Sequence, residues 1–197
     1  MLVALGLITG MVPLTEGQVF ARMKQAYGAA KTLKVQVRLA GTKNPATANI
    51  WFSRPDQLRV TGQSTFKSNY ELLINGQDRW LKTGDDWSRV VSVEMGISSI
   101  TGISGLTGST VPSLLFRTSW GSLLLEGDGK RAAKSEMLAG KKVYASPAIG
   151  QKVWVDASSF FLVRTYTKAG SFIYDARYRG TVVNEAVPPK VFVKPKD

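Results

Sequence analysis

The sequence contains no cysteine and no histidine among its 197 residues. Without cysteine, these residues form no disulfide, offer no thiolate nucleophile or zinc–thiolate site, and carry no cysteine for lipidation. Without histidine, the chain lacks the commonest general base and the commonest transition-metal ligand. These two absences disfavour hydrolase, metalloenzyme and phosphoryl-transfer chemistry before any motif is considered.

A long basic run is also missing, although the formal net charge is +12, from 26 Lys and Arg against 14 Asp and Glu. The cations are scattered, as in Lys34 and Arg38 or Lys141 and Lys142, and no aromatic stacking motif accompanies them. The solvated outer face of a sheet explains this charge better than a nucleic-acid groove. We therefore expect no nucleic-acid partner and keep an anionic membrane surface as a candidate partner.

A long apolar run is missing at the N-terminus too, because the run from Leu2 to Leu14 is shorter than the roughly 20 residues that a helix needs to cross a bilayer. The run from Leu2 to Leu14 resembles the core of a secretory signal, without a basic start or a small-x-small cleavage site. We expect residues 1–14 to be the remnant of a signal peptide, residues 15–197 to form a single domain, and the protein to be periplasmic or otherwise extracytoplasmic. The alternative is that this run is the first helix or strand of the fold.

A helix is predicted to begin at Thr15. Thr15 is a suitable N-cap, Gln18 occupies the capping-box position, and Leu14 can pack on Val19. Apolar residues then recur on one face as far as Ala30, with cations on the other face. This pattern indicates a helix that packs on a sheet.

From Thr32 onward the apolar period changes to two, and turn residues separate short alternating segments. The expected strands after the first include Ala46–Arg54, Gln57–Ser64, Tyr70–Ile74, Asp78–Lys82, Trp87–Val91, Lys130–Leu138, Lys141–Ser146, Gln151–Asp156, Phe160–Lys168, Ser171–Arg179 and Lys190–Lys194. The fold class is therefore α+β, with one large antiparallel sheet curled into an unclosed half barrel. The N-terminal helix and a central helical lid or plug are expected on its concave side.

The stretch from Val93 to Leu125 interrupts the strands and is apolar but rich in glycine. Its first part is expected to be a loose strip, and a helix is expected to begin at Pro112. Several glycines, each costing about 1 kcal/mol relative to alanine in a helix, favour a movable lid over a static plug of the core. The apolar residues of the first part are Ile97, Ile100, Ile103 and Leu106, and those of the second are Leu114, Leu115, Phe116, Trp120, Leu123 and Leu124.

Arg54 shares a strand face with Ile50 and Phe52, so its charge points toward the apolar side, where it needs acceptors. The carbonyls of the lid would provide them and form a latch. The alternatives are that Arg54 lies at the sheet rim or pairs with Asp56. No pair of carboxylates and no phosphate loop is recognisable, so no catalytic constellation is predicted.

Several motifs together resemble the LolA-type fold of the periplasmic lipoprotein carrier and its lipid-binding relatives. They are the N-terminal helix, Ile50-Trp51-Phe52-Ser53-Arg54-Pro55, Leu58-Arg59, Leu73-Ile74-Asn75-Gly76, Trp80, Val153-Trp154-Val155-Asp156, Arg164 and the segment from Asn184 to Phe192. The resemblance implies a half barrel that holds acyl chains under a helical lid, with Arg54 matching the arginine that contacts the lid. Leu58 stands where the carrier has an aromatic residue, and the glycine-rich strip does not align with it.

We therefore expect a carrier that binds lipid acyl chains, those of lipoproteins above all, and hands them on without covalent chemistry. It is expected to be a monomer without cofactor or metal, exchanging ligand with envelope membrane proteins. The alternative is a lipid-sensing or protein-sensing module of the same fold. The residues predicted to line the site are Arg54, Ile50, Phe52, Leu58, Ile97, Ile100, Ile103, Leu106, Leu115, Phe116 and Trp120.

Overall fold

A computed structural model describes residues 13–40, 43–104, 106–124, 129–148, 151–167, 170–174 and 181–195. The sheet contains β1 (Thr32–Ala40), β2 (Thr47–Ser53), β3 (Gln57–Gln63), β4 (Asn69–Asn75), β5 (Asp78–Thr83), β6 (Asp86–Arg89), β7 (Lys134–Leu138), β8 (Lys141–Ala148), β9 (Gln151–Asp156), β10 (Leu162–Thr167), β11 (Gly170–Tyr174) and β12 (Val182–Val183). The helices are α1 (Glu16–Ala29), α2 (Val93–Ser104), α3 (Leu106–Phe116), α4 (Ser119–Leu124) and the short 3-10 helix η2 (Pro189–Phe192). Most of the predicted signal remnant lies outside the described residues.

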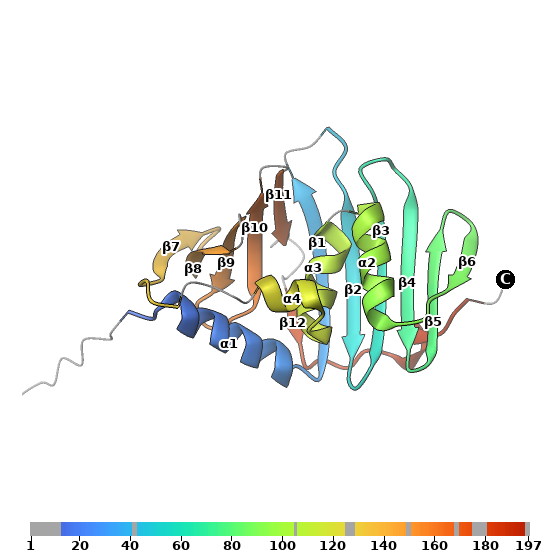
Figure 1. The fold of residues 1–197 in the computed structure, drawn as a ribbon, viewed down its shortest axis with the longest axis horizontal. Coiled ribbons are helices and arrows are strands. Elements are labelled where there is room, and N and C mark those ends of the chain that lie inside the picture. The colour runs from blue at the N-terminus through green and yellow to red at the C-terminus, as the bar shows by residue number, and fades with distance from the viewer. Residues whose placement is uncertain are drawn as a thin grey trace, which may run out of the picture.

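All strand pairs in the described part of the chain are antiparallel, and the order is β6-β5-β4-β3-β2-β1-β11-β10-β9-β8-β7, with β12 also paired to β1. The two ends of this path, β6 and β7, are not paired with each other in the described residues. The sheet is therefore unclosed, and the helices α1 to α4 lie on one of its faces (Figure 1). This arrangement confirms the predicted fold class.

The N-terminal helix begins where the sequence predicts. The Thr15 side chain accepts from the backbone N–H of Gln18, and the Gln18 side chain accepts from the backbone N–H of Thr15, which completes the capping box. Val19, Phe20 and Met23 are buried and pack in the main core with residues of β9 and β10. α1 therefore covers one half of the concave face.

The central segment differs from its prediction. The expected loose strip is the helix α2, and Pro112 lies inside α3 instead of starting it. α2 begins after Ser92, whose hydroxyl accepts from the N–H of Met95. A proline inside a helix removes one backbone hydrogen bond, which packing on all sides of α3 offsets. We call α2, α3 and α4 together the helical layer.

Two strand predictions were wrong. Most of the segment predicted as the strand Lys190–Lys194 lies in η2, because Pro189 occupies the first turn of this helix, where its fixed φ favours a helical start. The strand expected from Lys130 begins only at Lys134, since an isolated bridge between Ala132 and Thr15 precedes it. The strand predicted to reach Arg179 is described as far as Tyr174, and its remainder lies outside the described residues.

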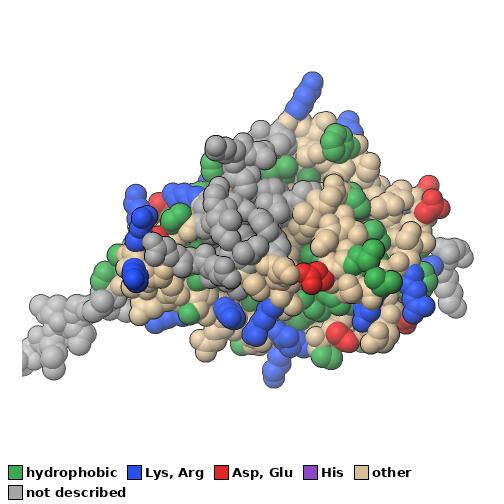
Figure 2. All heavy atoms as spheres, in the orientation of Figure 1, with side chains coloured by type: hydrophobic (Ala, Val, Ile, Leu, Met, Phe, Trp, Pro, Cys, Tyr) green, Lys and Arg blue, Asp and Glu red, His purple; other side chains and the backbone are tan. Residues whose placement is uncertain are grey.

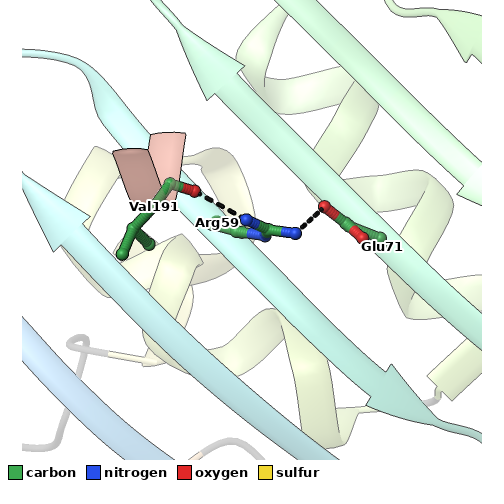
Figure 3. A network of polar contacts seen from close by, with 3 residues as sticks. All are labelled: Arg59, Glu71 and Val191. Atoms are coloured by element: carbon green, nitrogen blue, oxygen red, sulfur yellow. Dashed lines mark hydrogen bonds and ion pairs between the residues drawn. The ribbon is translucent and has the colours of Figure 1, made fainter. Parts of the chain in front are cut away.

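The C-terminal segment crosses the face of the sheet opposite the helices. η2 packs on β3 and β4 there. Arg59 donates to the carbonyl of Val191 at 2.9 Å and forms an ion pair with Glu71 at 2.8 Å (Figure 3). Phe192 is buried, and the ammonium of Lys194 lies 4.9 Å from the ring centroid of Trp80. These contacts fix the outer side of the sheet beneath the helical layer.

Among the described residues, none of the helices has the length and apolarity required to cross a membrane.

Candidate functional site

The concave faces of β2, β3 and β4 form an apolar floor. Cross-strand pairing places its six side chains in two rows that run across these strands. All six are completely buried. One row consists of Ile50, Val60 and Leu72, and the other of Phe52, Leu58 and Ile74. The predicted site residues Ile50, Phe52 and Leu58 are therefore brought together on one surface.

The helix α2 lies on this floor through the residues that recur every third position. Ile97 and Ile100 are buried, and Ile103 is partly buried against the same cluster. A Cβ added to Gly96 would lie 2.9 Å from a methyl carbon of Leu72. Glycine at this position therefore allows α2 to approach β4 more closely than any larger residue would.

The helix α3 contributes the second set of predicted residues. Leu115 is buried and belongs to the same core. The ring of Phe116 meets the ring of Phe52 edge to face, with centroids 5.6 Å apart. The side chains of Leu106 and Trp120, the last two predicted site residues, lie outside the described part of the chain.

Arg54 does not contact the carbonyls of the helical layer in the described residues. Its guanidinium donates instead to the carbonyls of Tyr27, Gly28 and Ala30 at 3.1 Å each, at the C-terminal end of α1. These carbonyls are the ones a helix leaves without internal donors, and a cation there is favoured by the helix dipole. The latch expected at the lid is thus a cap on α1.

The side chain of Tyr70 links the sheet to the junction of α2 and α3. Its hydroxyl donates to the carbonyl of Thr47 at 3.4 Å, and burial raises its pKa to about 12, with a hydrogen bond to Ser104 opposing the rise. Added Cβ atoms on Gly62 and Gly108 would lie 2.4 Å and 2.6 Å from the hydroxyl oxygen. Gly62 and Gly108 therefore make room for the side chain of Tyr70. The sequence signal that could have indicated this contact is Gly62, an isolated glycine in the strand pattern of β3.

Small polar side chains occupy several of the buried positions of α3, next to the apolar Val111, Leu114 and Leu115. Four buried hydroxyl-bearing residues line this helix, which are Thr107, Ser109, Thr110 and Ser113. The Thr107 hydroxyl has no hydrogen-bond partner in the described residues, and neither does that of Thr165, which is buried on β10. A buried hydroxyl without a partner costs about 1–3 kcal/mol. Both hydroxyl groups keep an unused capacity to donate and to accept a hydrogen bond.

The helix α2 is weakened by its own hydroxyl groups. The side chains of Ser99, Thr101 and Ser104 donate to the carbonyls four residues earlier, at 2.8, 2.9 and 2.7 Å. Hydroxyl groups that bond back to the helix in this way slightly destabilise it and often bend it. Together with its glycines, these bonds give α2 low intrinsic stability, so its helical form depends on packing against the floor.

One exposed carboxylate links α2 to α4 within the helical layer. Glu94, in the first turn of α2, accepts from the backbone N–H and the hydroxyl of Ser119 at 3.2 and 2.8 Å, at the start of α4. These hydrogen bonds hold the pKa of Glu94 below its usual value.

The described residues contain no group of three or more Asp, Glu, His or Cys that could hold a metal ion. The helical layer is suited to covering the apolar floor formed by β2, β3 and β4.

Several solved structures resemble this fold. Among them are the lipoprotein LppX of Mycobacterium tuberculosis (16% identity, TM-score 0.48, 88% of this chain and 97% of that one), LprF of Mycobacterium bovis (11%, 0.45, 86% and 91%) and a LolA superfamily protein of Nitrosomonas europaea (12%, 0.37, 92% and 98%). No protein-family model and no curated protein matches the chain.

Proposed function

We propose that this protein is an extracytoplasmic carrier that binds lipid acyl chains between the apolar floor and the helical layer, and hands them on without covalent chemistry. One observation carries the proposal. α3 is buried from Thr107 to Leu115, yet only Val111, Leu114 and Leu115 of these nine residues are large and apolar, and the other six are Ser, Thr, Gly or Pro. A helix retained only to complete a core would be expected to bury large apolar side chains at more of these positions. A helix that must leave the floor for a ligand is better served by small ones.

The energetics favour exchange over permanent closure. Burial of apolar surface stabilises by about 25 cal/mol per Å², both when the helical layer covers the floor and when an acyl chain does so. The six floor residues are all aliphatic or aromatic, whereas the covering helices carry back-bonded hydroxyls and several glycines. An acyl chain can therefore replace the helix contacts at small net cost, and the helix contacts can in turn displace the chain.

The two hydroxyls without partners support a ligand with a polar end. Thr107 lies on α3 and Thr165 on β10, so both belong to elements that enclose the concave side. An ester or amide carbonyl at the head of an acyl chain would accept a hydrogen bond from such a hydroxyl. Lipoprotein acyl chains carry these groups, and they are the ligand class we propose.

Lipid extraction tests the proposal. The protein would be purified from the envelope fraction without detergent, and bound lipid identified by native mass spectrometry and by solvent extraction. We expect co-purified diacyl lipid and saturable uptake of a fluorescent fatty acid by the delipidated protein. An empty protein that takes up no fatty acid would contradict the proposal. Vesicle binding without any extraction of lipid would favour a sensing module instead.

A further inference from the structure

Four cations lie along the edge of the molecule formed by α1, and we call them the basic edge. Arg22 and Lys24 are exposed on α1 itself, Lys31 follows the end of that helix, and Arg117 follows α3. A Cβ on Gly28 would lie 3.0 Å from a guanidinium nitrogen of Arg117, so Arg117 is directly beside α1. Figure 2 shows Lys and Arg side chains gathered where α1 lies in Figure 1.

The helix α1 itself contributes no exposed carboxylate to this edge. The acidic residue of α1, Glu16, is buried at the start of the helix. Within the described residues, none of the four cations of the basic edge forms an ion pair. The C-terminal carbonyls of α1 are already occupied by Arg54, so these cations are not needed to cap the helix. The four cations lie on or beside α1, with the guanidinium carbon of Arg22 5.2 Å from the ring centroid of Phe160 and Arg117 beside the helix. Like charges without counter-charges repel each other and favour an anionic partner.

We propose that the basic edge docks on the anionic headgroups of a lipid bilayer. α1 has 14 residues and is thus about 21 Å long at 1.5 Å per residue, which matches several headgroups side by side better than one small anion. Basic side chains near an anionic leaflet attract it over roughly a Debye length. The position of Arg117 between α3 and α4 also brings the helical layer to the same surface.

Co-sedimentation with vesicles tests this inference on the full chain. Vesicles of phosphatidylcholine alone would be compared with vesicles containing phosphatidylglycerol at low salt. Each cation near the surface contributes about a fivefold gain in partitioning, so replacing Arg22, Lys24, Lys31 and Arg117 by glutamine should lower binding several-hundredfold, to roughly that of neutral vesicles. The control variant replaces Lys34, Lys43, Lys141 and Lys142 by glutamine. These four lysines are exposed on other segments, and the change in net charge is the same.

The control should retain most of its binding to anionic vesicles. Equal losses in the two variants, or no preference of the unchanged protein for anionic vesicles, would overturn the inference. If the first variant does not fold, a second experiment uses a fluorophore attached to the variant Gln25→Cys. The label is specific to this position because the chain has no other cysteine. Its emission should shift to the blue on anionic vesicles, while the same label on Ser88→Cys of β6 should not respond. Equal responses at both sites, or none at Gln25→Cys, would also overturn the inference. Because vesicle binding is measured without fatty-acid uptake, its result tests membrane docking independently of the carrier function.

Discussion

The hydroxyl oxygen of Tyr70 occupies the space that a side chain at position 108 would need, since a Cβ on Gly108 would lie 2.6 Å from it. This contact joins β4 to α3 next to the junction with α2. It couples the position of the helical layer to the floor of the site. Any change at this contact should therefore alter both the stability of the closed form and the ease of ligand entry.

Gly108→Ala is expected to destabilise the protein by about 1–3 kcal/mol, because overpacking a well-filled contact forces its neighbours to move. Urea unfolding measures this loss. Tyr70→Phe in the same chain should recover part of it, because the nearest of the conflicting atoms is removed. Purely additive losses in the double variant would show that the two residues do not compete for this space.

Gly102→Ala makes a matched comparison on α2. A Cβ at this exposed position meets nothing within 4 Å, so the substitution changes helix propensity without a clash. We expect a gain of about 1 kcal/mol in the free energy of unfolding. If the helical layer must open for a ligand, fatty-acid uptake in stopped-flow fluorescence should also become slower. An unchanged uptake rate in a measurably stabilised variant would show that opening of the helical layer does not depend on the helical stability of α2.

The unpartnered hydroxyls give a third prediction. Thr165→Val removes a buried hydroxyl without changing the shape of the side chain, and should stabilise the empty protein by about 1–3 kcal/mol while weakening lipid retention. Thr107→Val should likewise stabilise the empty protein and weaken lipid retention. Thr101→Val is the control, because the Thr101 hydroxyl donates to the carbonyl of Ile97 at 2.9 Å and its loss brings no such gain. Thermal unfolding and fatty-acid titration of the three variants would distinguish these outcomes.

Arg54 gives the fourth prediction. Arg54→Leu leaves three carbonyls at the end of α1 without their donor, and a loss of about 1–3 kcal/mol is expected. Arg54→Lys keeps the charge but not the fork of donors, so it should recover only part of the loss. Hydrogen exchange should show faster opening at the C-terminal end of α1. Faster exchange confined to α2 and α3 would instead support the latch predicted from the sequence.

The sequence was informative where local pattern decides structure. The period-two segments placed most of the strands, and Thr15 with Gln18 placed the start of α1, because a capping box is a short-range signal. Pro112 was misleading, because a proline is most often found at the start of a helix and here tertiary burial overrides that preference. The acceptors of Arg54 and the contact between Tyr70 and Gly108 depend on segments distant in the chain. Strand alternation could therefore indicate the sheet face on which Arg54 or Tyr70 lies, but not the residues that it contacts.

Photolabelling tests the central claim most directly. A fatty acid with a diazirine in its tail would be bound, irradiated, and its adducts located by peptide mass spectrometry. Binding under the helical layer predicts adducts on the floor of β2 to β4 and on the facing side of α2 and α3, at residues such as Phe52, Ile97 and Leu115, and competition by unlabelled fatty acid. Adducts confined to the opposite face of the sheet, around Trp80 and Thr61, or labelling that unlabelled fatty acid does not reduce, would contradict the account.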